Sequence, residues 1–327
     1  MSTDATARLR VALARVALAA AALTFVVIVA SAFMRHTQAG LACADWPACY
    51  GRIESSGGDS TPSPGVRAAR IAHRIAATSV LALVIGLLLI AWTQKPAWKR
   101  EGNLALAALL VAAALAVLGI ATPGARVPAI TLGNLLGGYL MLALLVATAA
   151  AAMRTIDTRA PSASSPNPLR WSALALLVVV LAHAASGGMI GAQYALTSCP
   201  TVGACEGFSP GQLLTGGALD PLRALSIVDG RVAPPDGAAG LHVAHRLSGL
   251  VVVVATLMLA YRLRQSDRRA AQMLVALVLG ALLLGLAALA RMPSLPLTVL
   301  HNAMSAALIA TLAHFASRGR PLRARMS

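Results

Sequence analysis

The sequence predicts an all-α, polytopic membrane protein with eight transmembrane helices, arranged as two parallel, pseudo-twofold-related four-helix bundles. Three observations support this fold class. Hydrophobic residues make up 58% of the 327 residues and charged residues only 12%, which is too apolar for a water-soluble domain. The apolar residues fall into long runs. Two distant parts of the chain also share one cysteine spacing, followed in each case by an Ala-His-Arg triplet.

Eight apolar runs are long enough to cross a bilayer, whose core of about 30 Å needs roughly 20 residues of helix. They are rich in Ala, Leu and Val and do not alternate with polar residues, which favours helices over an outer-membrane barrel. Three arginines lie near the start of the first run, as before the apolar part of a signal peptide, but the run is longer than that part, so we expect it to remain as a span. The predicted spans are about 12–34, 68–92, 103–121, 128–153, 170–191, 241–261, 270–290 and 296–316.

The positive charges predict how the chain is oriented. The formal net charge is +16, and 17 of the 27 Lys and Arg residues fall on the side of both termini when the eight spans alternate. This positive-inside bias predicts that both termini lie in the cytoplasm. We expect the membrane to be the bacterial plasma (inner) membrane. The basic residues occupy short loops and tails without interleaved aromatics, which does not favour nucleic-acid binding.

Two cysteine pairs lie on the opposite, periplasmic side of this topology, in an oxidising space. We therefore expect two local disulfides. A structural staple is the favoured role, and a redox-active pair near a bound cofactor or a metal ligand set are the alternatives. The pairs are Cys43 with Cys49 and Cys199 with Cys205, 156 positions apart.

The repeated cysteines indicate a duplicated unit. The segment 155–169 is rich in small polar residues and proline, as a linker is, and four spans lie on each side of it. Both halves then enter the membrane in the same direction, which makes the repeat parallel. We predict a first half over 1–154, a cytoplasmic linker over 155–169 and a second half over 170–327. The Gly- and Pro-rich stretch 207–240 predicts an irregular outer excursion.

Three histidines are predicted to lie at a similar depth near the outer face. His73 opens the second span, His245 opens the sixth, and His301 lies in the outer part of the eighth. Ionisable groups at membrane depth are costly and mark functional sites. Histidines on different helices of a bundle can hold a haem iron from both faces, as His245 and His301 would. Arg74 and Arg246 would suit haem propionates.

The histidines could also have roles other than holding a haem iron. A single membrane histidine often makes an interhelical hydrogen bond, and zinc is less favoured because no helix carries His-x-x-x-His. His242 precedes His245 by three residues on the same helix face and would be an alternative ligand. His36 and His183 are accessory groups of uncertain role, and His314 lies near the cytoplasmic end.

The segment Gly-Leu-Ala-Cys-Ala-Asp-Trp-Pro-Ala-Cys at 40–49, with the two His-Arg openings and eight spans, resembles haem A synthase, the COX15/CtaA family. The resemblance covers nearly the whole chain. It implies a haem b bound between His245 and His301 in the second half, and haem O as the substrate of the first. The C8 methyl group of haem O would be oxidised through an alcohol to the formyl group of haem A, for cytochrome c oxidase.

The resemblance also implies where substrate meets protein. His73 would hold the substrate iron, with Arg74 beside it at the catalytic site, and haem O synthase and cytochrome oxidase assembly factors would be partners. Two positions depart from the family pattern: Asn134 stands where a fourth histidine is expected, and Arg70 where a glutamate is common. These departures keep open a non-catalytic haem b-binding assembly protein. The parallel repeats and glycine-rich helices keep open a small-solute transporter.

Overall fold

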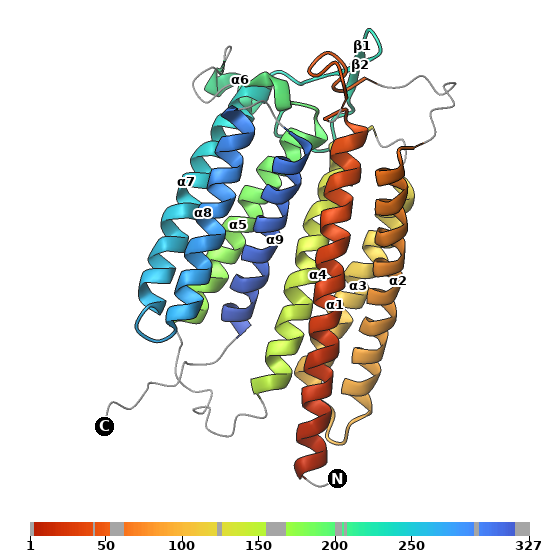
Figure 1. Cartoon of the computed structure of the whole chain (residues 1–327), viewed down its shortest axis with the longest axis vertical. Helices are drawn as coiled ribbons and strands as arrows, with labels where there is room; N and C mark the ends of the chain where they lie inside the picture. Colours follow the sequence, from red (N-terminus) through yellow and green to blue (C-terminus); the bar gives the residue numbers. More distant parts are fainter. Residues whose placement is uncertain are drawn as a thin grey trace.

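A computed structural model describes residues 3–41, 43–52, 62–122, 126–154, 168–199, 205, 208–290 and 294–317. Within these residues, eight helices are long and apolar enough to cross a bilayer, so the chain is a multi-pass membrane protein, as predicted (Figure 1). They are α1 (Thr3–Gln38), α2 (Pro64–Thr93), α3 (Lys99–Ala121), α4 (Pro128–Arg154), α5 (Pro168–Ala192), α7 (Ala238–Leu263), α8 (Arg268–Ala290) and α9 (Leu295–Ser317).

The eight helices contact one another in two rings of four. In the first half, α1 packs against α2 and α4, and α3 packs against the same two helices. In the second half, α5 packs against α7 and α9, and α8 packs against the same two. The halves meet where α4 contacts α5 and α9, and where α1 contacts α9 (Figure 1). The division into a substrate half and a haem b half stays a prediction.

Several helices extend beyond the predicted spans. α1 begins at Thr3 instead of near 12, and α2 begins at Pro64, where the Ser63 side chain accepts a hydrogen bond from the Val66 amide. The apolar run marks only the part of a helix inside hydrocarbon, whereas the helix itself continues into the interface. The prediction that His73 and His245 open their helices is therefore wrong, because both lie in the third turn.

The predicted linker lies almost wholly outside the described residues. α4 ends at Arg154 and α5 begins at Pro168, two residues before the predicted start of the second half. Residues 155–167 are not described, and neither is the basic tail after Ser317. The first residues of α1 and the last of α9 lie at the same end of the bundle, as an even number of spans requires (Figure 1).

The outer excursion of the second half, predicted to be irregular, contains secondary structure. A short helix, α6 (Pro210–Thr215), precedes a hairpin of β1 (Ser226–Val228) and β2 (Arg231–Ala233). The turn residues Asp229 and Gly230 both have positive φ, at 50° and 74°. An Asp-Gly pair is favoured in such two-residue turns, so the hairpin had a signal in the sequence.

This excursion is hydrogen-bonded to the first half. The Val232 amide donates to the Gly51 carbonyl at 2.9 Å, next to the first cysteine loop. The Leu225 amide donates to the Arg126 carbonyl at 2.7 Å, just before α4 begins. The loops at the cysteine end of the bundle therefore join the two halves independently of the contacts between their long helices.

At the opposite end, a buried ion pair connects α1 to the start of α3. Arg10 lies 2.8 Å from the Glu101 carboxylate, and the two side chains are only 15% and 4% exposed. The Arg10 guanidinium also lies 4.1 Å from the centre of the Trp98 ring. This pair fixes the N-terminal part of α1 against the first ring of helices.

We expect Glu101→Ala to lower the free energy of unfolding by about 3 kcal/mol, because it leaves a buried guanidinium without its carboxylate. Denaturant unfolding in mild detergent would measure the loss. Lys99→Ala, at an exposed position of the same helix, is the matched control and should have little effect. Equal effects of the two substitutions would contradict a stabilising role for the pair.

Candidate functional site

Three histidines from three helices gather in the interior of the second half. His183 of α5 and His245 of α7 stack face to face, with ring centres 4.2 Å apart and ring planes 5° from parallel. His301 of α9 lies within electrostatic range of both rings. The structure thus brings together the two predicted haem ligands, His245 and His301, and adds His183 to them.

Two serines hold the stacked rings reciprocally. His183 Nδ1 lies 2.9 Å from the Ser248 hydroxyl on α7, and His245 Nδ1 lies 2.9 Å from the Ser186 hydroxyl on α5. Ser186 donates its proton to the His183 carbonyl, and Ser248 donates to the His245 carbonyl. A hydroxyl has one proton, so each serine oxygen accepts from Nδ1–H. Each imidazole therefore keeps a lone pair on Nε2.

His301 reaches the same protonation pattern by a different contact. Its Nδ1 lies 2.9 Å from the Ala281 carbonyl of α8. Because a carbonyl only accepts hydrogen bonds, Nδ1 carries the proton and Nε2 keeps its lone pair. A metal-binding histidine usually has its other ring nitrogen oriented in this way by a carbonyl or a hydroxyl.

A glycine on a neighbouring helix lies against each of the three rings. A Cβ atom on Gly187 would stand 2.8 Å from His245 Cε1, and one on Gly249 would stand 3.2 Å from His183 Cε1. For Gly285, the distance to His301 Cε1 would be 3.4 Å. A Cβ on Gly187 would therefore overlap the His245 ring and one on Gly249 would crowd the His183 ring, whereas one on Gly285 would make an ordinary van der Waals contact with His301.

These contacts come from a short motif that the sequence analysis missed. The pattern His-x-x-Ser-Gly occurs at 183–187 in α5 and again at 245–249 in α7. The serine and the glycine of each copy contact the histidine of the other copy. We call these six residues the His-Ser-Gly clamp: His183, Ser186, Gly187, His245, Ser248 and Gly249.

The remaining histidines serve other contacts. His242 Nε2 lies 2.8 Å from the Ala195 carbonyl and donates to it, which does not favour the predicted ligand exchange with His245. His36 is buried, with Nε2 3.4 Å from the Arg35 guanidinium. His314 lies near the end of α9, as expected, and its ring meets Phe315 edge to face.

Both predicted disulfides are formed, Cys43–Cys49 and Cys199–Cys205. The second one lies beside Arg246, whose guanidinium is 3.3 Å from Cys205 Sγ and 3.5 Å from the Cys199 carbonyl. Arg246 therefore connects the clamp region of α7 to the outer cysteine loop. Its predicted contact with a haem propionate stays a prediction.

The first half places its predicted residues differently. His73 is half-buried on α2, whereas Arg70 and Arg74 are exposed. The Asn134 amide donates to the Thr122 hydroxyl at 2.7 Å, so it links α4 to the end of α3. Of the two departures from the family pattern, Arg70 is an exposed cation and Asn134 makes an interhelical hydrogen bond. The role of His73 as a ligand of the substrate iron stays a prediction.

A cavity of about 450 Å³ lies at the outer face, where the first cysteine loop meets residues from the second half. Tyr50 contacts Trp46 edge to face and lies 5.8 Å from Tyr194, ring centre to ring centre. Burial raises the pKa of Tyr50 and of Tyr194, so both phenols stay neutral. The cavity is lined by Pro47, Ala48, Tyr50, Tyr194, Thr197, Val228, Arg231, Val232, Ala233 and Pro234.

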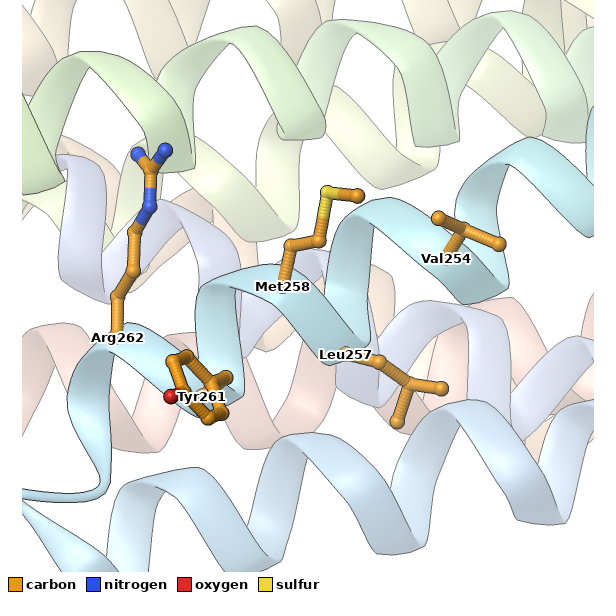
Figure 2. Close-up of a pocket in the computed structure, with 5 residues that line it drawn as sticks. All are labelled: Val254, Leu257, Met258, Tyr261 and Arg262. Atoms are coloured by element: carbon orange, nitrogen blue, oxygen red, sulfur yellow. The ribbon is translucent and has the colours of Figure 1, made fainter.

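A second hollow, of about 420 Å³, lies on the exposed side of α7, along residues 254–262 (Figure 2). Its lining comes from one helix: Val254, Leu257, Met258, Tyr261 and Arg262. Figure 2 shows Arg262 extending away from the Tyr261 ring, and its guanidinium donates to the Ser172 hydroxyl of α5 at 3.2 Å. Exposed apolar side chains beside Tyr and Arg are typical of a lipid-facing surface at the membrane interface.

Residues 14–59 and 69–313 match the sequence pattern of a known protein family, COX15-CtaA, whose description is cytochrome oxidase assembly protein. Haem A synthase of Shewanella oneidensis is 28% identical over 306 residues, which cover 88% of this chain and 91% of that protein. The matched ranges include His73, both cysteine pairs and the clustered histidines of the second half.

We expect Gly187→Ala to lower the free energy of unfolding by about 1–3 kcal/mol, because the added methyl group would overlap the His245 ring, which is stacked on His183. Gly86→Ala is the matched control, since a Cβ there meets nothing within 4 Å. That control should stabilise α2 by up to about 1 kcal/mol through helix propensity. Thermal unfolding in detergent would compare them, and a stabilised Gly187→Ala would contradict the close contact.

Proposed function

Because the chain belongs to the COX15-CtaA family of cytochrome oxidase assembly proteins, we propose that it is an oxidoreductase of haem A biosynthesis. The proposed reaction oxidises the C8 methyl group of haem O, through an alcohol, to the formyl group of haem A, which is then used in cytochrome c oxidase. The observation that carries the proposal is the histidine cluster of the second half, in which imidazoles from three helices lie within electrostatic range of one another and each has its Nδ1 bonded to a protein oxygen.

The residues of the second half fit a haem b. His245 and His301 stand on opposite helices of a four-helix ring, and each has Nδ1 bonded to a protein oxygen and Nε2 available. We propose that these two nitrogens hold the haem iron and that Arg246 serves a propionate. Bound there, haem b would supply one-electron transfer.

The first half would receive haem O. His73 is the half-buried imidazole of α2, and Asn134 donates its amide to Thr122 instead of offering a second ligand. We propose that His73 alone holds the substrate iron and leaves the opposite coordination position open to water. Conversion of a methyl to a formyl group with oxygen taken from water releases four electrons and four protons. We propose that the haem b of the second half would pass these electrons, one at a time, to a one-electron acceptor in the membrane.

The proposed location is the bacterial inner membrane, with both termini in the cytoplasm. The two disulfides lie at the end of the bundle opposite to the first residues of α1 and the last residues of α9, which supports a periplasmic position for the cysteine loops. Haem O synthase, which would supply the substrate, and cytochrome oxidase assembly factors, which would receive the product, are the proposed partners on either side of the reaction.

A second function is favoured by two departures from the family pattern. Asn134 lies where a ligand is expected, and Arg70 lies where a glutamate is common, which fits a haem b-binding assembly protein without catalysis. A small-solute transporter, which also fits parallel repeats, is a further alternative and predicts a protein without haem.

We expect the chain to produce haem A in a bacterial host that makes haem O and has no haem A synthase of its own. Pigment extraction and chromatography of the membranes would measure it. His73→Ala should lower haem A roughly tenfold or more while the purified protein keeps its two-imidazole haem b spectrum, because the lost ligand belongs to the substrate. His314→Ala, near the other end of the bundle, should leave both readouts unchanged.

The three functions give different results in this experiment. A haem b spectrum without any haem A from the unchanged chain would favour the assembly protein. Purified protein without haem absorbance would favour the transporter. Either result would overturn the proposed reaction.

A further inference from the structure

We propose that His183 is a positioning residue, which sets the orientation of the His245 ring as an iron ligand through the His-Ser-Gly clamp. This inference rests on the proposed haem b of the second half. It adds a role for α5, because the proposed ligands come only from α7 and α9. It also explains why an ionisable residue lies in the middle of an apolar helix, where such residues are costly.

The first argument concerns the freedom of the His245 ring. A histidine ring rotates broadly about its last side-chain bond, so a ligand needs contacts that select one orientation. The hydrogen bond to Ser186 fixes the direction of Nδ1, and the stacked ring of His183 fixes the plane at 5° from its own. Gly187, one turn after His183 on the same helix, allows the close approach.

The second argument concerns which of the stacked rings is a ligand. Two axial imidazoles approach a haem iron from opposite faces, with their nitrogens pointing at each other across the metal. His183 and His245 lie parallel with ring centres 4.2 Å apart, so they cannot stand on opposite faces of one iron. One of them pairs with His301, and the other lies alongside the ligand.

The third argument concerns the strength of the ligand. The His245 Nδ1–H donates to Ser186, and the Ser186 hydroxyl donates in turn to the His183 carbonyl at 2.7 Å. Hydrogen bonds in such a chain strengthen one another. A stronger bond at Nδ1 makes Nε2 a more basic ligand. His183 therefore supports His245 in two ways: its carbonyl accepts the Ser186 hydrogen bond, and its ring stacks on the His245 ring.

The test uses purified full-length protein loaded with haem b, and it does not depend on haem A production. The readouts are the haem-to-protein ratio after dilution and the electron paramagnetic resonance (EPR) spectrum of the ferric haem. In His183→Ala, two-imidazole coordination should remain, but the largest g-value should shift and its line should broaden, because the ring plane of His245 is no longer selected. His183→Phe, which keeps a stacked ring, should restore much of the wild-type spectrum.

Ser186→Ala tests the hydrogen bond separately. We expect haem retention to fall roughly tenfold, as is typical when the partner of a metal-bound histidine is removed. Ser305→Ala is the matched control: the Ser305 hydroxyl also donates to a histidine carbonyl, that of His301, and among the described residues this is its only hydrogen bond. This control should leave haem retention and the EPR spectrum unchanged.

The outcomes separate this inference from the proposed function. An unchanged EPR spectrum in His183→Ala, in a protein that still binds haem b, would overturn the positioning role and leave the proposed function standing. Two-imidazole coordination that is lost in His183→Ala but kept in His245→Ala would make His183 the ligand and also overturn it. A wild-type protein without haem b would overturn both proposals.

Discussion

A polar ring inside a membrane must find its hydrogen-bond partners within the protein, and this constraint shapes the whole interior of the second half. Hydrocarbon offers no water to an imidazole, so His183 and His245 each use a hydroxyl on the helix that carries the other. The exchange holds α5 and α7 in one register. With the proton on Nδ1, both rings are neutral and Nε2 is unprotonated, which is the state that a metal ligand requires.

The two halves have the same order of helix contacts but different side chains in their interiors. Their helices contact in the same cyclic order, and each half has one disulfide in its outer loop. In the second half, imidazoles from three helices converge. In the first half, Asn134 is engaged with Thr122 and His73 is the half-buried histidine of α2. The same order of helix contacts thus surrounds two chemically different environments.

Some of this was predictable from the sequence. Composition and run length predict the eight spans, because hydrophobicity and length alone decide which segments can cross a bilayer. Equal cysteine spacing and topology predict the two disulfides. The role of His183 was not predictable in the same way, because a histidine in an apolar run acquires meaning only from the register of its neighbouring helix. The helix starts were missed because the interface tolerates both helical and irregular backbone.

The hydrogen bonds from the outer excursion to the first half have a consequence for biogenesis. Gly51 and Arg126 are synthesised long before Leu225 and Val232, the residues whose amides bond to their carbonyls. The carbonyls of Gly51 and Arg126 can therefore gain these amide donors only after more than two thirds of the chain has been made. The first half cannot complete its contacts at the cysteine-loop end of the bundle from its own residues alone.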